Sequence, residues 1–186
     1  MYATQQLRDE HDGILVMLSV LEQLARELQH GREVNRTHLE QALDFLRTFA
    51  DRCHHGKEED LLFPALREAG LPSEGGPIGV MLHEHTEGRA HIRGMADALA
   101  RLQAGADGAD TFARHALGYV ALLRAHIDKE NNVLFALAER LLPPEAHTRL
   151  AADFDRVESE RIGPGVHERY HALIRQLRDT YLRPAA

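Results

Sequence analysis

Histidine and glutamate recur in this sequence in a pattern that suits metal binding. Residues 54–63 read H-H-G-K-E-E-D-L-L-F and residues 126–135 read H-I-D-K-E-N-N-V-L-F, so His, Lys, Glu, Leu and Phe share offsets 72 positions apart. A Glu-His pair precedes each copy, as Glu10-His11 and as Glu84-His85. Each half therefore offers one isolated His and one His-x3-Glu pair, whose side chains lie one helical turn apart. Imidazole nitrogens and carboxylate oxygens are ligands for iron, manganese and zinc.

The elements that must position these residues are helices, because strand signals are nearly absent and apolar residues recur at helical spacing. Residues 7–28 carry an apolar seam with alternating steps of four and three, which predicts an amphipathic helix. A second helix is expected to begin with a capping box of Thr37 and Glu40 and to run to about Leu62. Pro64 is expected to kink or interrupt it.

Two further long helices complete the pattern. The third is expected to begin at Gly76-Pro77, with proline near the first helical position, and to end at Gly105. The fourth is expected to be capped by Asp107 or Asp110 and to stop before Pro143-Pro144. Its predicted inward seam reads Phe112, Ala116, Tyr119, Leu123, His126, Glu130, Val133 and Leu137. Four long helices with short loops predict an all-α, up-down-up-down four-helix bundle.

Additional C-terminal helices are predicted beyond this bundle. They cover about Glu145–Glu160 and about Val166–Leu182, with a break at Gly163-Pro164-Gly165. We therefore predict a bundle over residues 1–142 and a helical extension over residues 143–186 that packs on the same domain.

Several repeated polar residues occupy places that a bundle normally fills with apolar side chains. They are His11, His54, Glu58, His85, His126 and Glu130. An uncompensated buried carboxylate costs several kcal/mol, against a typical total stability of about 5–15 kcal/mol. Two metal ions supply the compensation, since neutral imidazoles donate nitrogen and each glutamate can bridge two ions. A donor set without thiolate favours iron first and manganese second, with zinc as a further alternative.

This order of motifs resembles the hemerythrin-like (HHE cation-binding) domain, over about Leu7 to Leu141. The resemblance implies a four-helix bundle with a carboxylate-bridged, non-haem di-iron centre, in which two irons share an oxo or hydroxo bridge. By position it makes terminal ligands of the four histidines and bridges of the two glutamates. These residues are His11, His54, His85 and His126, with Glu58 and Glu130.

The sequence differs from the oxygen-carrying members of that family, which indicates another branch. Met81 and Arg89 flank His85, where the carriers have a second His one turn away, and Glu130 replaces an Asp that stands one residue later. His55 stands where the carriers usually have Phe, and the repeat equates it with Ile127, so His55 either supplies a ligand or lines the pocket. The resemblance then implies a protein that reacts with or senses oxygen, peroxide or nitric oxide, or that handles iron.

Two alternatives accompany the di-iron interpretation. A metal-dependent sensor or interaction module would signal through the C-terminal helices without turnover. Residues 167–171 read H-E-R-Y-H, which matches the H-E-x-x-H motif of zinc hydrolases, with His167 and His171 as ligands and Glu168 as general base. That pattern is short and follows no predicted substrate-binding strand, so packing of this helix against the bundle is the favoured reading. The remaining histidines are expected at the surface: His30, His38, His83, His91, His115 and His147.

Composition excludes several other classes of protein. The 186 residues include 22 Lys and Arg against 29 Asp and Glu, a net charge of −7, which argues against a nucleic-acid partner. The longest uncharged apolar run, Gly13 to Leu21, is too short to cross a bilayer, and no signal-peptide pattern is present. A single Cys53 cannot form an intrachain disulfide. We therefore expect a cytoplasmic protein with a small diatomic or peroxide ligand and no membrane partner.

Overall fold

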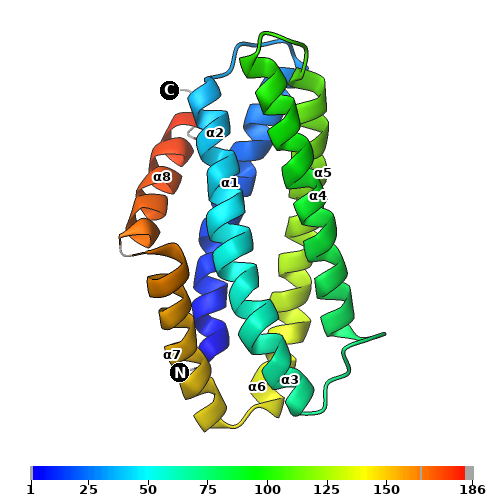
Figure 1. Cartoon of the computed structure of the whole chain (residues 1–186), viewed down its shortest axis with the longest axis vertical. Coiled ribbons are helices and arrows are strands. Elements are labelled where there is room, and N and C mark those ends of the chain that lie inside the picture. Colours follow the sequence, from blue (N-terminus) through cyan, green and yellow to red (C-terminus); the bar gives the residue numbers. More distant parts are fainter. Residues whose placement is uncertain (1, 164, 183–186) are drawn as a thin grey trace.

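The computed structural model describes residues 2–163 and 165–182, and four long helical segments form its core (Figure 1). Several segments labelled η have the wider turn of a π-helix. The four segments are α1 (Ala3–Gln29); α2 (Arg36–Phe45) with η1 (Leu46–His55), η2 (Glu58–Leu62) and α3 (Phe63–Glu68); α4 (Pro77–Gln103); and α5 (Ala109–Lys129) with η3 (Glu130–Leu134) and α6 (Phe135–Leu141). The described residues contain no strand, so the predicted all-α bundle is confirmed.

The C-terminal helices lie along α1 (Figure 1). They are α7 (Pro144–Val157), η4 (Glu158–Ile162) and α8 (Val166–Tyr181). Gly163 and Gly165 take φ values of 97° and 77°, which glycine adopts without strain, and the helix breaks there as predicted. Pro164 lies outside the described residues. Phe154 of α7 joins the same buried apolar cluster as Leu7 of α1. The division of the chain at residue 142 stays a prediction.

Two helix starts differ from the sequence-based expectation. Asn35, and not Thr37, caps α2, because the Asn35 side chain accepts a hydrogen bond from the Thr37 backbone N–H at 3.0 Å. Gly108, and not Asp107 or Asp110, precedes α5. A Cβ atom at Gly108 would lie 2.4 Å from the carbonyl oxygen of Ala98, so close approach to α4 selects glycine at this position.

The second helix continues through Pro64, so the predicted interruption is wrong. Pro64 lies in the first turn of α3, and the helix runs on to Glu68. Proline normally clashes with the carbonyl four residues earlier in a regular helix. Here the wider turn of η2 directly precedes Pro64, and we attribute the tolerance of proline to that widening.

A π-helical turn also shifts the buried face of the fourth helix. Val133 and Leu137 were predicted to face inward, but Val133 is 49% exposed, whereas Leu134 and Ala138 are buried. Both corrections amount to one position. Val133 lies within η3 and Leu137 lies after it, and the wider turn of η3 accommodates an extra residue, which shifts the buried face of the helix by one position.

The apolar core is divided into two clusters with a polar layer between them. One cluster includes Ile14 and Ile92, and the other includes Leu7 and Met81. His11 follows Leu7 by one turn and precedes Ile14, and His85 lies in the same way between Met81 and Ile92 on α4. The bundle therefore encloses its histidines between two apolar regions that exclude water.

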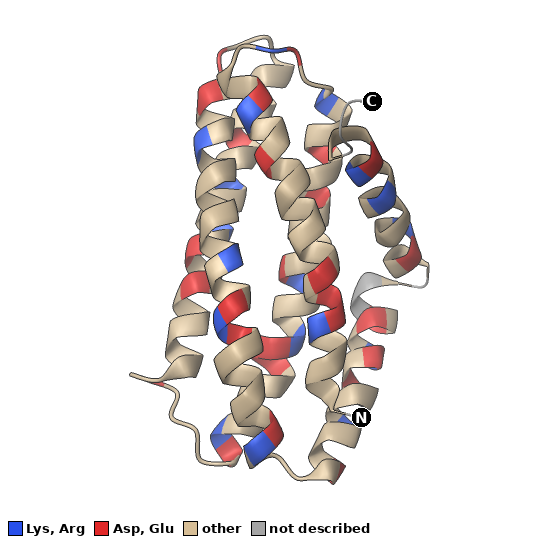
Figure 2. Cartoon of the chain, turned by 180° about the vertical axis from the view of Figure 1, so that it is seen from behind, with Lys and Arg blue, Asp and Glu red and all other residues tan. Residues whose placement is uncertain are grey.

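The outside of the bundle is polar. Figure 2 shows basic residues scattered among acidic ones over the helices that face the viewer, in keeping with the net negative charge. Among the described residues, none of the helices combines enough length with enough apolar character to pass through a bilayer.

Candidate metal centre

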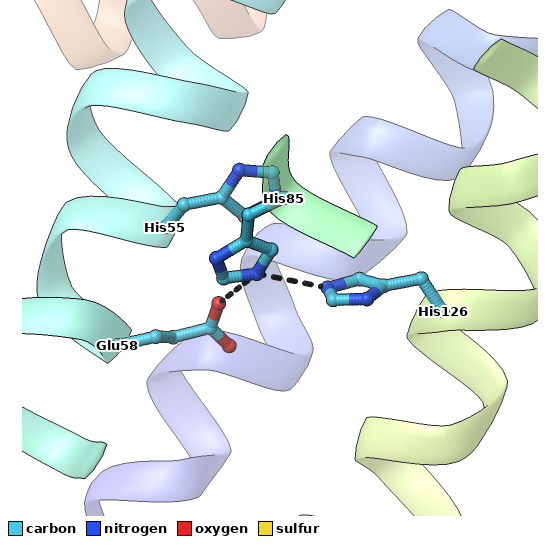
Figure 3. A group of neighbouring side chains, drawn as sticks. All are labelled: His55, Glu58, His85 and His126. Carbon is cyan, nitrogen blue, oxygen red and sulfur yellow. Dashed lines mark hydrogen bonds and ion pairs between the residues drawn. The ribbon is translucent and has the colours of Figure 1, made fainter. Parts of the chain in front are cut away.

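All seven predicted site residues meet in the polar layer, and each side chain is nearly or fully buried. They are His11, His54, His55, Glu58, His85, His126 and Glu130. Figure 3 shows four of them converging from separate elements. His54 and His55 end η1, while Glu58 and Glu130 begin η2 and η3. Wide π-helical turns are frequent at functional sites, and here they aim several candidate ligands inward.

The residues divide into two groups that share Glu58. In each group the candidate ligand atoms lie within 4.8 Å of one another. The first group is His11, His54, Glu58 and Glu130, and the second is His55, Glu58, His85 and His126.

The two carboxylates span these groups. Glu58 Oε1 lies 3.5 Å from His54 Nε2, and its Oε2 lies 3.5 Å from His85 Nε2. Glu130 Oε2 lies 3.2 Å from His11 Nε2, and its Oε1 lies 3.2 Å from His126 Nε2. Each carboxylate therefore directs one oxygen at each half of the repeat, the arrangement that a bridging ligand requires.

Outer hydrogen bonds assign the tautomers of the four repeated histidines. His54 Nδ1 donates to Glu10 Oε2 at 2.7 Å, and His126 Nδ1 donates to Glu84 Oε2 at 2.9 Å. Carboxylates accept only, so these Nδ1 atoms carry the protons. His85 Nδ1 likewise donates to Glu59 at 2.6 Å.

His11 Nδ1 completes the set by donating to the Asn131 side-chain oxygen at 2.9 Å. In the neutral ring the four Nε2 atoms are then lone pairs that face the interior. This is the usual arrangement of histidines that bind metal.

These lone pairs face each other at short range. His11 Nε2 and His54 Nε2 are 2.9 Å apart, and His85 Nε2 and His126 Nε2 are 3.1 Å apart. Both oxygens of Glu58 and of Glu130 are also buried without a hydrogen bond of normal geometry. Opposed lone pairs and buried carboxylate oxygens without hydrogen bonds require positive charge between them. The nitrogen and oxygen donors therefore fit a pair of metal ions.

The pKa values of the buried residues also indicate that the layer attracts positive charge. Burial would raise the pKa of Glu130, but His126 and His11 hold it well below its usual range. Burial would lower the pKa of His85, but Glu58 and Glu59 raise it to about 9. Without metal the layer attracts protons onto its histidines, and metal binding releases such protons.

His55 behaves differently from the repeated histidines. Burial, with the neighbouring His85 and His126, lowers its pKa well below the usual range, so the ring is neutral. Its ring stacks on His85, with the centroids 3.9 Å apart (Figure 3). The inward orientation inferred from the equivalent Ile127 is what the structure shows, and ligation by His55 stays a prediction.

Charged residues around the candidate ligands have a role that the sequence analysis did not predict. Lys57 binds Glu10, which holds His54, and Lys129 binds Glu84, which holds His126. Each glutamate of a Glu-His pair thus reaches across to the histidine of the other helix in its hairpin. The repeated lysine was the available signal, because its offset from the His-x3-Glu pair is identical in the two copies.

The other histidines follow no single pattern. His147 was expected at the surface, but it is 1% exposed, and its Nδ1 accepts a hydrogen bond from the Ala3 N–H at 3.3 Å. That contact satisfies an N–H at the start of α1, which the helix itself cannot pair. The predicted hydrolase motif places the rings of His167 and His171 4.5 Å apart, with Glu168 exposed. His167 packs beside Phe49, with ring centroids 5.4 Å apart.

Comparisons with known proteins agree with this site. Residues 2–138 match the family described as "Hemerythrin HHE cation binding domain". An uncharacterized protein of Mycobacterium tuberculosis (strain ATCC 25618 / H37Rv) is 24% identical over 162 residues, covering 87% of this chain and 63% of that protein. The "Iron-sulfur cluster repair protein YtfE" of Musicola paradisiaca (strain Ech703) is 27% identical over 142 residues, covering 75% of this chain and 64% of that protein. The chain thus spans less than two thirds of these relatives. No solved structure matches it.

Proposed function

The chain belongs to the hemerythrin HHE cation-binding family, and from that premise we propose that it binds two iron ions and reacts with or senses a small oxidant. In this proposal His11 and His54 bind one ion and His85 and His126 bind the other, with His55 as an additional ligand of the second. Glu58 and Glu130 bridge the two. When bound, the irons supply reversible one-electron chemistry toward oxygen, peroxide or nitric oxide.

The observation that carries the proposal is the pair of opposed imidazole nitrogens. Two Nε2–Nε2 separations of 2.9 and 3.1 Å recur in the two halves of the repeat, and each pair faces the same two carboxylates. A structural bundle gains nothing from this arrangement, because apolar residues of similar volume avoid the cost of burying it.

Iron is favoured by the donor set and supported by one relative. Imidazole with carboxylate suits iron and manganese, and Cys53 is absent from both groups of candidate ligands. The relative named as an iron–sulfur cluster repair protein connects the family with iron. Manganese and zinc are the alternative occupants.

The protein's own residues then have three tasks. Glu10, Glu59 and Glu84 hold the Nδ1 protons and so keep the Nε2 atoms available. The two apolar clusters exclude water from above and below the layer. The first half offers two imidazoles where the second offers three, so we place the small ligand at the less crowded half, beside His11 and His54.

A sensor is the second candidate, and one contact favours it. Glu158 in the C-terminal extension binds Lys57 at 2.5 Å, and Lys57 holds the Glu10 carboxylate that orients His54. A change at His54 can therefore reach the extension through charged groups. In that case the extension over residues 143–186 is the output element of the same domain.

Metal analysis of protein reconstituted with ferrous iron under anaerobic conditions tests the central proposal. We expect two irons per chain and a visible absorption change on exposure to oxygen or peroxide. Fewer than one iron per chain would overturn it. Steady-state peroxide consumption, measured before and after removal of iron, separates an enzyme from a sensor, because a sensor changes state without turnover.

A further inference from the structure

A pocket between α1, η4 and α8 adjoins the first half of the candidate metal centre. Its volume is about 210 Å³ and its lining contains three carboxylates and two imidazoles. The lining residues are Gln6, Asp9, Glu10, Glu158, His167 and His171. The two histidines belong to the H-E-x-x-H motif, which the proposed di-iron function leaves without a role.

Three of these residues lie close enough together to bind one metal ion. Glu10, Glu158 and His167 each offer a ligand atom within 4.8 Å of the others, and they come from three different elements. His171 stands one turn after His167 on the same helix, with the two rings 4.5 Å apart. Two oxygens and one nitrogen suit Fe²⁺, Mn²⁺ or Zn²⁺.

A cationic group already occupies this position. The Lys57 ammonium contacts Glu10 and lies 2.5 Å from Glu158 Oε1, although the Lys57 side chain is completely buried. The structure therefore accommodates positive charge between these two carboxylates. A divalent ion must displace that ammonium, so its binding is weaker and more exchangeable than at the buried layer.

Glu10 connects the pocket with the centre. Glu10 lines the pocket, and one of its oxygens contacts the buried Lys57 ammonium while the other accepts the His54 Nδ1 hydrogen bond at 2.7 Å. His11 and His54 are each only 1% exposed, so an ion bound by them needs a path from solvent. The pocket supplies such a path up to the residue that touches His54.

We propose that Glu10, Glu158 and His167, with His171 beside them, form a capture site that takes one divalent metal ion from solvent before it reaches the dinuclear centre. This inference rests on the proposed function of that centre. The capture site binds weakly because an ion held tightly there would not move on. Lys57 returns to the two carboxylates when the ion leaves, which keeps the vacated site neutralised.

Stopped-flow uptake of Fe²⁺ by metal-free protein under anaerobic conditions tests the capture step. His167→Ala is expected to slow uptake on the order of tenfold while the final content stays at two irons per chain. His83→Ala, on the exposed side of α4, is the matched control and should load at the wild-type rate. Wild-type loading by His167→Ala would overturn the capture role.

Mn²⁺ titration followed by electron paramagnetic resonance tests the site directly, in protein whose dinuclear centre is already filled with iron. We expect one additional, weakly bound Mn²⁺ per chain in wild-type protein and its loss in His167→Ala. No additional ion in wild-type protein would refute the site. If the centre itself fails to take two irons, the proposed function fails, and Mn²⁺ binding that depends on His167 still decides the capture site.

Discussion

The two halves of the polar layer share one repeated sequence pattern, yet their surroundings differ. Glu59 and Asn131 occupy equivalent positions, so His85 donates to a carboxylate while His11 donates to a neutral amide. Arg89 in turn binds Glu59 at 2.7 Å. A carboxylate that accepts the Nδ1 hydrogen bond makes the imidazole more basic, so its Nε2 atom binds a metal ion more strongly. The repeat therefore specifies the candidate ligands of both halves, and the outer partners make the halves chemically unequal.

A second difference concerns access. Lys57 is fully buried and binds Glu158 of the C-terminal extension, whereas its equivalent Lys129 is 39% exposed. His55 also lies beside His85 and His126, whereas the equivalent position in the second copy of the repeat is Ile127, which offers no ligand atom. The half with fewer candidate nitrogen ligands is thus the one beside the extension and its pocket.

Glu130→Gln is expected to have the largest effect, because this carboxylate faces one imidazole of each half. Glutamine keeps the volume but removes the charge, so both ions should be lost and iron should fall below one per chain. The metal-free variant should be less stable than metal-free wild type, because Glu130 pairs with His11 and His126 in the buried layer and its charge is lost.

Metal analysis and thermal unfolding check this prediction. Glu87→Gln, at an exposed position on α4, is the matched control. Retention of two irons by Glu130→Gln would refute the bridging role.

Metal-free protein is expected to lose stability as the solution becomes alkaline. Burial would lower the pKa of His85, but Glu58 and Glu59 raise it to about 9. A histidine with a pKa of about 6.5 in the unfolded chain then contributes fully below pH 6.5 and loses its contribution as pH rises through about 9. The loss is on the order of 3 kcal/mol.

Urea unfolding of metal-free protein at about pH 6.5 and about pH 9.5 measures this loss. Iron-loaded protein should show much less of it, because the metal replaces the proton. Glu59→Gln should reduce the pH dependence of the metal-free protein. An identical pH dependence in Glu59→Gln would show that the outer carboxylate does not distinguish the halves.

His55→Ile gives position 55 the residue that the repeat has at the equivalent position, Ile127, and so tests whether the His55 imidazole binds metal. We expect two irons to bind, with the affinity for the ion beside His85 and His126 reduced about 10- to 100-fold. The visible spectrum should change as well, because a nitrogen donor is lost. Competition with a chelator measures the affinity. An unchanged spectrum and unchanged affinity would assign His55 to the pocket lining.

Glu59→Gln makes the hydrogen-bond partner of His85 neutral, and Asn131→Asp makes the partner of His11 charged. Their effects on iron affinity should be the smallest. The first should weaken iron binding about tenfold, and the second should strengthen it by less, because only the strength of hydrogen bonding to Nδ1 changes. Titration of iron against a chelator at constant pH compares them. Effects of the same sign in both variants would contradict the assignment of unequal halves.

The candidate site residues could be predicted from the sequence because polar residues replace apolar ones at matching positions in both copies of the repeat. His85, His126 and Glu130 stand on apolar seams, and the His-x3-Glu pairs recur with Lys at the same offset. Helical periodicity then determines which face they share. The roles of Glu10 and Glu84 were not accessible, since each binds a histidine on the neighbouring helix more than 40 positions away.

The all-α bundle and the inward placement of the repeated histidines and glutamates could be predicted from the sequence, because both depend on local spacing. Contacts between residues far apart in the chain could not be predicted in this way, because local spacing carries no information about them. The tertiary structure buried His147 against the start of α1, and it joined Glu158 to Lys57 across more than 100 positions. It also moved the buried face from Val133 to Leu134, because a π-helical turn adds a residue without any mark that periodicity can detect.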